Sequence, residues 1–288
     1  MRERRTARKR RFLVCPPEYF EVRYAINPWM TSEEPVDTAL ALRQWESLVS
    51  VYRDLGHDVE IVTPVAGLPD MVFAANSALV LDGRAFGARF LAPERQPESG
   101  HYRAWFENAG FEVGGAVHIC EGEGDFTPVG GLLLAGTGFR TLPQAHQEAQ
   151  EFFGVPTVSL RLVDPLFYHL DTALFALDDD NVAYYPGAFS PGSRRVLETL
   201  FPDAVIATAQ DAKCFGLNSV SDGHHVVIAQ DAAGLIAALA DRGYRPVPVD
   251  LSEFRKAGGG VKCCTQELRT REARTRERLE NRAVTASA

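Results

Sequence analysis

This chain of 288 residues lacks both long hydrophobic runs and a regular cysteine framework. Its longest apolar stretches, at 130–136 and 226–229, fall far short of the roughly 18 residues that a membrane helix needs. Residues 1–11 include seven basic side chains, but no apolar segment of a secretory signal follows them. Five irregularly spaced cysteines argue against a disulfide scaffold and favour free thiols. We therefore expect a cytoplasmic protein that does not contact a membrane.

Motifs for metals and dinucleotides are missing as well. The sequence has no Cys-x-x-Cys or His-x-x-x-His spacing, so we predict no metal site. It also has no Gly-x-Gly-x-x-Gly after its first strand, which weakens the alternative fold of two doubly wound domains. The composition, 45% hydrophobic and 24% charged, is typical of a globular protein with a substantial core.

Charge is unevenly distributed along the chain. The formal net charge is −8, but residues 1–11 carry +6 and the remainder carries −14. Such an acidic body repels nucleic acid and suits a cationic small-molecule substrate. We predict that residues 1–11 are a disordered basic arm, that 12–268 form one catalytic domain and that 269–288 are a charged tail. The sequence leaves open whether the protein is a homo-oligomer.

A repeat of about 47 residues organises the chain. At five positions a polar residue adjoins an apolar run: Asn76, Asp125, Asp171, Asn218 and Thr265. Successive positions are 49, 46, 47 and 47 residues apart. Helix-like stretches at 102–109, 143–153, 193–201 and 232–241 lie between hairpin-like units, and another at 37–54 precedes them. Five ββαβ units of this kind can be arranged around a central axis as a closed ring, as in propeller folds. We predict an α/β fold, a five-bladed α/β propeller with pseudo-fivefold symmetry, in which the polar points meet at the centre.

The segment Gly258-Gly-Gly-Val-Lys-Cys-Cys places two cysteines directly after a glycine run. Glycines allow a backbone to approach a ligand closely, as a site that presents a thiolate requires. The alternative is a loop followed by two inert buried cysteines. A partner base elsewhere in the chain would favour the reactive reading.

His169 is the candidate base, because it lies in His169-Leu-Asp-Thr at one of the periodic points. We expect a strand here, in which His169 and Asp171 would share a face. The alternative is a hydrogen-bonded core histidine.

Several acidic residues occur at matching positions of the repeat, namely Asp70 and the run Glu121-Gly-Glu123-Gly-Asp125. Carboxylates beside a thiol and an imidazole suit a planar cation such as a guanidinium. Arg95 and Arg140 are candidates for binding a substrate carboxylate, although each could equally form a surface ion pair.

With these motifs the chain resembles the guanidino-group modifying superfamily over residues 12–268. His169-Leu-Asp171-Thr and Gly-Gly-x-x-Cys at Gly259–Cys263 carry the resemblance, in the family order of acid, histidine and cysteine. It implies the same five-bladed fold, known as pentein.

The resemblance also implies residue roles. Cys263 rather than Cys264 would be the nucleophile, His169 the general acid and base, and Glu123 the carboxylate that orients it. Asp70 and Asp171 would grip the guanidinium, and Arg95 and Arg140 the substrate carboxylate. Since Glu-Gly-Glu-Gly-Asp departs from the commoner Glu-Gly-Gly-Asp, Glu121 is the alternative to Glu123.

Two asparagines distinguish the branches of this superfamily. The segments Asn27-Pro-Trp-Met and Phe-Ala-Ala-Asn76 resemble those of arginine dihydrolases. This resemblance implies that Asn27 and Asn76 bind the substrate. We therefore expect a hydrolase that uses a covalent cysteine intermediate and no cofactor, converting arginine to ornithine, ammonia and carbon dioxide. The alternatives are dimethylarginine dimethylaminohydrolase and, from another class, a non-catalytic arginine-binding protein.

Overall fold

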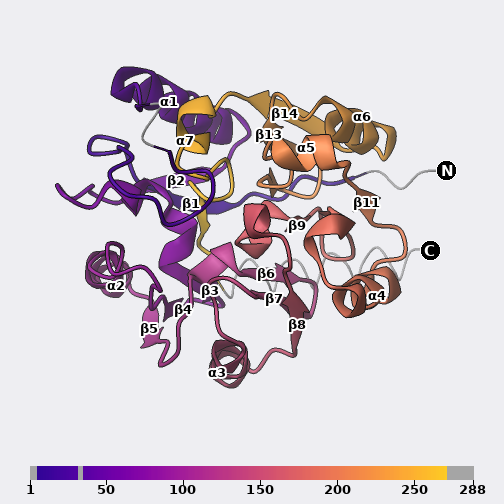
Figure 1. Ribbon diagram of the computed structural model, residues 1–288, viewed down its shortest axis with the longest axis horizontal. Coiled ribbons are helices and arrows are strands. Elements are labelled where there is room, and N and C mark those ends of the chain that lie inside the picture. Colours follow the sequence, from indigo (N-terminus) through magenta and orange to yellow (C-terminus); the bar gives the residue numbers. More distant parts are fainter. Residues whose placement is uncertain (1–4, 32–34, 271–288) are drawn as a thin grey trace.

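The computed structural model describes residues 5–31 and 35–270. Five three-stranded sheets stand around a central axis, with the longer helices on the outside of the ring (Figure 1). Within each sheet, two strands pair antiparallel and a third joins them in parallel. The predicted five-bladed architecture is thus confirmed.

Four of the units follow one another along the chain, each as hairpin, helix and parallel strand. Their elements are β3 (Ala78–Leu81), β4 (Arg84–Gly87), α2 (Glu98–Asn108), β5 (Glu112–Gly115), β6 (Phe126–Val129), β7 (Leu132–Thr137), α3 (Pro143–Phe153), β8 (Thr157–Arg161), β9 (Leu174–Ala176), β10 (Val182–Tyr184), α4 (Pro191–Leu200), β11 (Val205–Ile206), β12 (Val220–Ser221), β13 (His225–Ala229), α6 (Ala233–Asp241) and β14 (Arg245–Val249). Two shorter helices, α5 (Ala209–Lys213) and α7 (Ser252–Arg255), lie in connections. The predicted helices are present, although α2 begins four residues earlier than expected.

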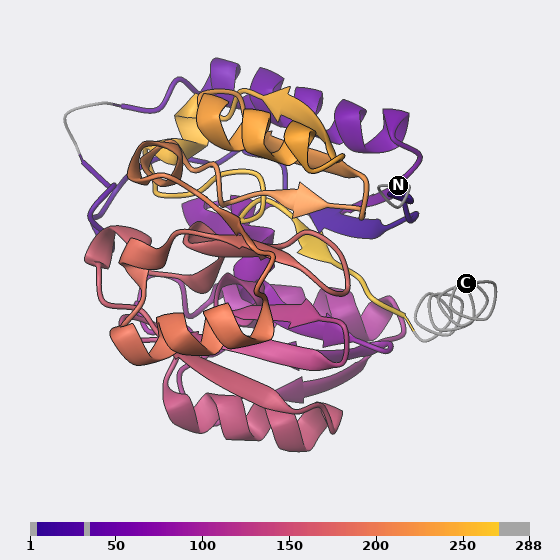
Figure 2. The ribbon, with the colours of Figure 1, turned by 90° about the vertical axis from the view of Figure 1, so that its right-hand side faces the viewer.

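The fifth unit joins the two ends of the described chain. It consists of β15 (Gln266–Glu267), β1 (Arg11–Val14), α1 (Thr38–Asp54) and β2 (Asp58–Ile61). Phe12 of β1 lies opposite Glu267 of β15 in an antiparallel pair. Figure 2 shows these strands from the side of the ring. This pairing closes the ring. It also holds Thr265, the last of the periodic polar residues, close to β1.

Residues 5–11, the described part of the predicted basic arm, lie against the body of the protein. Arg5 pairs with Asp178, and its guanidinium also lies 4.2 Å from the ring centre of Tyr244. The backbone NH of Arg8 donates to Asp222 O, and its side chain pairs with Asp179. Since the body of the protein is acidic, its carboxylates hold the basic segment against the ring.

Two residues of the predicted C-terminal tail, Arg269 and Thr270, are among the described residues. Arg269, placed in that tail by the sequence, bonds the buried carboxylate of Glu123 and also that of Glu267. Residues 271–288 of the tail lie outside the described residues.

The periodic polar residues come just before the innermost strand of each blade. Asn76 and Asp171 lie in short 3₁₀ turns, η2 (Ala74–Ser77) and η5 (Leu170–Thr172), and Asp125 follows η3 (Gly122–Gly124). These residues link neighbouring blades, since Asp125 accepts from the backbone of Leu170 and Asn218 donates to the carbonyl of Asp171. The repeat therefore brings buried polar side chains to one end of the axis.

Candidate functional site

The Cys263 side chain lies buried where two blades meet. Its sulfur accepts from Asn218 Nδ2 at 3.1 Å and donates to Asp171 Oδ2 at 3.2 Å, while its backbone NH donates to Asn218 Oδ1 at 3.1 Å. The glycine run lets the backbone pass close to Phe73, because a Cβ on Gly259 would lie 2.1 Å from the ring of that residue. The thiol is therefore fixed in one place against a carboxylate.

The adjacent Cys264 has different surroundings. It is fully buried in an apolar cluster that includes Phe12 and Tyr52. Burial raises the pKa of its thiol well above the ordinary value. Of the paired cysteines, Cys263 is thus the one placed among polar groups.

His169 contacts Glu121 and not Glu123, which corrects the expected geometry. Its Nε2 lies 2.8 Å from Glu121 Oε2. Glu123 instead bonds Lys262 and Arg269, on another side of the turn. Glu121 precedes η3 and Glu123 lies within it, and the change of backbone direction between them sends the two carboxylates to different sides.

The strand expected around His169 is a second correction. His169 has extended backbone angles, but Asp171 lies in the 3₁₀ turn η5, so the two residues do not share a strand face. Both still reach the site, because Asp171 contacts Cys263 and His169 contacts Glu121. The turn therefore aims them at the same centre from different directions.

Four buried polar atoms of the predicted site have no hydrogen-bond partner among the described residues: Asp70 Oδ1, Asn76 Nδ2, His169 Nδ1 and Asp171 Oδ1. Buried polar groups are nearly always paired in folded proteins, so each of these atoms needs an explanation. Two are carboxylate acceptors, one is an amide donor and one is an imidazole nitrogen. This set suits a planar ligand that both donates and accepts hydrogen bonds.

Gly124 brings Asn76 and His169 together. A Cβ at this position would lie 2.4 Å from Asn76 Nδ2 and 3.2 Å from His169 Nδ1. A side chain here would therefore displace Asn76 or His169. Asn76 Nδ2 and His169 Nδ1, which have no partner among the described residues, both lie next to Gly124.

The two predicted carboxylate-binding arginines lie in the wall of the site, each on a buried glutamate. Arg95 bonds Glu98 and Asn76, and Arg140 bonds Glu121 and the carbonyl of Ile26. Their contact with a substrate carboxylate stays a prediction.

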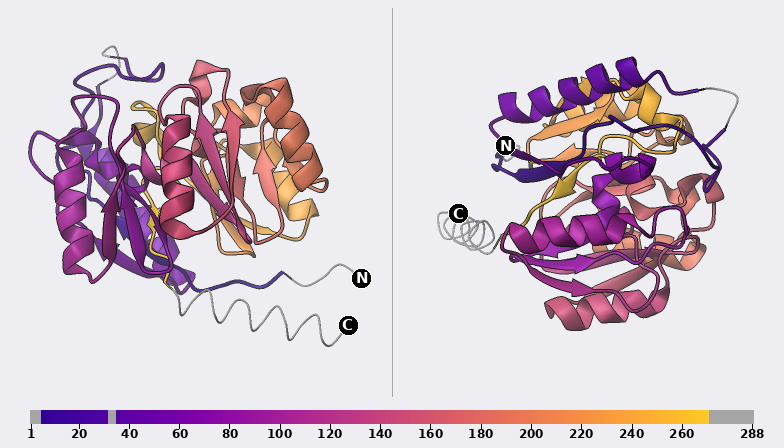
Figure 3. Two further views of the ribbon diagram at one scale, coloured as in Figure 1. Left: turned by 90° about the horizontal axis from the view of Figure 1, so that it is seen from below. Right: turned by 90° about the vertical axis from the view of Figure 1, so that its left-hand side faces the viewer.

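A segment between β1 and α1 covers the site. Tyr24 OH donates to Asp70 Oδ2 at 2.8 Å, and the Trp29 indole donates to Leu166 O at 2.9 Å. The predicted Asn27 donates to the carbonyl of Ala257, just before the glycine run. Figure 3 shows this segment on the face opposite the two termini. Asn27 therefore braces the cysteine loop, and its contact with substrate stays a prediction.

Burial and charge set the protonation states of the site. Burial raises the pKa of the Cys263 thiol well above its ordinary value, and Asp171 raises it further. Burial also raises the pKa of Asp171 to about 6. Burial opposes ionisation of Glu121, but Arg140 and His169 outweigh it and lower the pKa of this carboxyl well below its usual range. The site therefore combines a neutral thiol with carboxylates that can meet a cation.

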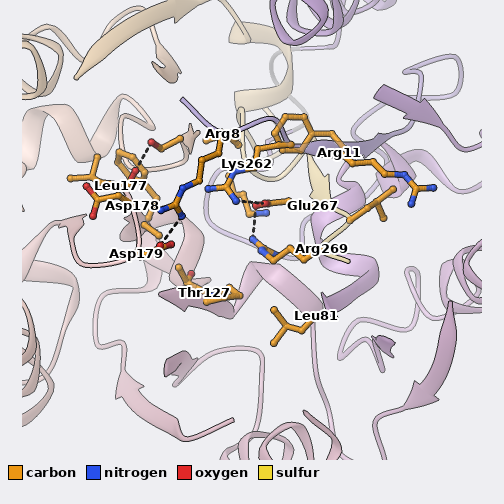
Figure 4. Close-up of a pocket in the computed structure, with 18 of the residues that line it drawn as sticks. Arg8, Arg11, Leu81, Thr127, Leu177, Asp178, Asp179, Lys262, Glu267 and Arg269 are labelled. Atoms are coloured by element: carbon orange, nitrogen blue, oxygen red, sulfur yellow. Dashed lines mark hydrogen bonds and ion pairs between the residues drawn. The ribbon is translucent and has the colours of Figure 1, made fainter. Parts of the chain in front are cut away.

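A cavity of about 480 Å³ lies on the other face of the ring (Figure 4). Its lining includes Arg8, Lys262, Glu267 and Arg269, close to the described ends of the chain. Asp171, which contacts Cys263, also lines it. Its basic residues bond acidic neighbours, as in the pairs Arg8–Asp179 and Arg269–Glu267.

No helix among residues 5–31 and 35–270 is long and apolar enough to cross a membrane. In the same part of the chain, no three His, Cys, Asp or Glu side chains are grouped as metal ligands would be.

Known proteins share both the sequence and the fold. The chain is 51% identical over 265 residues to N(G),N(G)-dimethylarginine dimethylaminohydrolase of Mycobacterium tuberculosis, covering 92% of this chain and 88% of that protein. It belongs to the guanidino-group modifying superfamily. The protein is accordingly an enzyme, a hydrolase that acts on guanidino C–N bonds of a small molecule, and the expectation of a non-catalytic binder is set aside. No protein-family model matches the chain.

Arginine dihydrolases are also similar. The chain is 38% identical over 262 residues to the bifunctional arginine dihydrolase/ornithine cyclodeaminase ArgZ of Synechocystis, but it spans only 37% of that longer protein. The crystal structure of the N-terminal domain of ArgZ, as a cysteine-to-serine variant bound to substrate, superposes with a TM-score of 0.88 at 36% identity. It covers 91% of this chain and 99% of the domain.

Sequence reasoning missed two residues of the site. Asn218 contacts the thiol, and its place in the 47-residue series was a usable signal. Glu98 is a fully buried carboxylate that bonds Arg95. Its position at the start of a helix resembles an ordinary first-turn acid, so the sequence gives no signal for it.

Proposed function

We propose that the protein is an arginine dihydrolase, with Cys263 as nucleophile and His169 as general acid and base. One arginine and two waters would give ornithine, two ammonia molecules and carbon dioxide. The observation that carries this proposal is the set of unpartnered atoms around Cys263, which joins carboxylate acceptors with one amide donor. Such a set can hold first a guanidinium and then the neutral ureido group made from it.

The first step is attack of the Cys263 sulfur on the guanidinium carbon. Asp171 lies against the thiol and has one oxygen without a partner, so it is placed to accept from a guanidinium NH. Asp70 supplies a second acceptor for the cationic substrate. The bound cation favours the thiolate, so the substrate activates its own nucleophile.

His169 then moves the protons. Its Nε2 is held by Glu121, which leaves Nδ1, without a partner among the described residues, as the nitrogen available to substrate. The imidazole protonates the ammonia that leaves as the tetrahedral adduct collapses. It next takes a proton from the water that releases citrulline from the cysteine.

We infer that Asn76 allows the reaction to continue beyond citrulline. An aspartate would pair with the guanidinium but would meet the neutral ureido oxygen with another acceptor. The amide Nδ2 can donate to that oxygen and hold citrulline for a second attack by Cys263. The second ammonia then leaves, and hydrolysis of the thiocarbamate gives a carbamate that loses carbon dioxide.

The arginine dihydrolase ArgZ lends support to this proposal, since structures of its N-terminal domain, similar in fold to this chain, are described with substrate and with product bound. The test is Asn76→Asp with arginine as substrate, followed by mass spectrometry of the products. We expect the product to shift from ornithine towards citrulline. If the wild type yields only citrulline, the argument from the amide is wrong, even if Cys263 and His169 act as proposed.

Dimethylarginine hydrolysis is the second candidate, favoured by the 51% identity to the Mycobacterium tuberculosis enzyme. The same thiol and imidazole would expel dimethylamine in place of ammonia. Arginine, citrulline and asymmetric dimethylarginine supplied separately distinguish the two candidates. Dimethylamine from the last substrate, with no ornithine from the first two, would replace our proposal.

A further inference from the structure

Glu98 is a buried carboxylate at the first residue of α2, with no exposed surface. Both of its oxygens face Arg95, since Oε1 accepts from Nε at 3.0 Å and Oε2 from Nη2 at 2.9 Å. This bidentate fork fixes the plane of the guanidinium as well as its position. The backbone adds to it, because the NH of Glu98 donates to the carbonyl of Arg95.

Arg95 uses the rest of its fork within the site. Nη2 also donates to the carbonyl of Asp70 at 3.2 Å, and Nη1 donates to Asn76 Oδ1 at 2.8 Å. The guanidinium lies 4.6 Å from the ring centre of Phe90. Burial alone would lower the pKa of Arg95, but Glu98 outweighs it and raises the pKa above its ordinary value. Arg95 is therefore a charged group that donates in fixed directions.

This contact determines which way the Asn76 amide is turned. A guanidinium has no acceptor, so the atom of Asn76 that meets Nη1 must be the oxygen. The NH₂ group then lies on the other side, above Gly124 and beside His169 Nδ1, where it has no partner among the described residues. A flipped amide would place its NH₂ against a cation and lose that bond.

We propose that Glu98 is a positioning residue of this enzyme: by fixing Arg95, it keeps the Asn76 NH₂ group directed at the reacting centre, and so sets the share of substrate that loses a second nitrogen. This inference rests on the proposed arginine dihydrolase function. It adds a residue that touches neither substrate nor cysteine. Without the carboxylate, Arg95 loses its bidentate anchor and no longer holds the Asn76 oxygen in a fixed direction. Asn76 then loses its fixed partner, and citrulline leaves before the second attack.

The test is Glu98→Gln, which keeps the size of the side chain but puts a donor against the guanidinium. We expect the ratio of ornithine to citrulline formed from arginine to fall at least 10-fold. Consumption of arginine should fall less than about 5-fold, because Cys263, His169 and Asp171 keep their contacts. With citrulline as substrate, KM should rise more than kcat falls.

The matched control is Glu107→Gln. Glu107 lies on the same helix, where its exposed side chain pairs with Arg103. Its product ratio should equal that of the wild type. A melting curve for each variant separates positioning from general damage, because a merely structural effect would lower both half-reactions in parallel with Tm.

Two outcomes would overturn the inference. If the wild type forms ornithine and Glu98→Gln leaves the product ratio unchanged, the positioning role fails while the proposed function stands. If the wild type forms no ornithine from arginine or from citrulline, the proposed function fails and this inference fails with it.

Discussion

The Glu123 carboxylate bonds the side chain of Lys262, the residue immediately before Cys263. It also accepts from the backbone NH of Glu267, in the strand β15 that closes the ring. Glu123 thus ties the turn η3, which follows Glu121, to the loop that carries the thiol. A residue expected to orient the histidine instead fastens two blades together.

Replacing Glu121 should therefore lower mainly the activity, and replacing Glu123 mainly the stability. Glu121→Gln removes the charge that holds His169, and we expect kcat per folded molecule to fall about 10²-fold or more. Stability should fall as well, because Arg140 also loses its buried carboxylate partner. Glu123→Ala leaves Lys262 without its buried partner, and we expect a loss of about 3–5 kcal/mol in the free energy of unfolding. Steady-state kinetics and chemical denaturation measure the two effects. A larger loss of activity per folded molecule in Glu123→Ala than in Glu121→Gln would contradict these roles.

Covalent labelling should single out Cys263 among the five free cysteines. A chloroacetamidine carries the positive charge that Asp171 attracts, so it brings its own means of forming the thiolate. We expect it to modify Cys263 and arginine to block it, as read by peptide mass spectrometry. Neutral iodoacetamide should prefer Cys214, which is the only one of the five that is not buried.

Two serine variants serve as controls for the labelling. Cys264→Ser should still be labelled, whereas Cys263→Ser should be inert and, like His169→Ala, should lose several orders of magnitude in turnover. Equal modification of all five cysteines would argue that no thiol is activated.

Acid should weaken catalysis through Asp171. Burial raises the pKa of this carboxyl to about 6, opposed by the nearby His169, Cys263 and Lys262 and assisted by Asp125. Only the ionised form can grip a guanidinium, and that form is lost as the pH falls through 6. We expect kcat/KM for arginine to drop about 10-fold for each pH unit below this point. Circular dichroism at each pH checks that the fold persists. A flat profile between pH 7 and 5 would show that ionised Asp171 is not required.

The repeat made most of the fold predictable from the sequence. Five polar residues at nearly equal spacing fixed the number of blades, and glycine and turn signals located the hairpins. β1 was not predictable in the same way, because its partner β15 is only two residues long and lies about 250 residues away. Pairing at that separation depends on the closed ring and not on any local pattern.

The site was predictable in its residue types but not in its contacts. Motifs placed Cys263, His169 and Asp171 together, since a short turn carries two of them and a glycine loop the third. The choice between Glu121 and Glu123 depended on the backbone conformation at the start of η3, which sequence spacing does not specify. The order of basic residues 5–11 depended on carboxylates from distant blades, such as Asp178 and Asp222.

The pairing of β1 with β15 has a consequence for how the enzyme becomes active during its synthesis. A ribosome makes the blades one after another, and the nucleophile follows four of them. Cys263 lies three residues before β15, so we expect the thiol to gain its fixed place beside Asp171 and Asn218 only when β15 docks on β1. On this expectation, pairing of a two-residue strand is the step that completes the catalytic site.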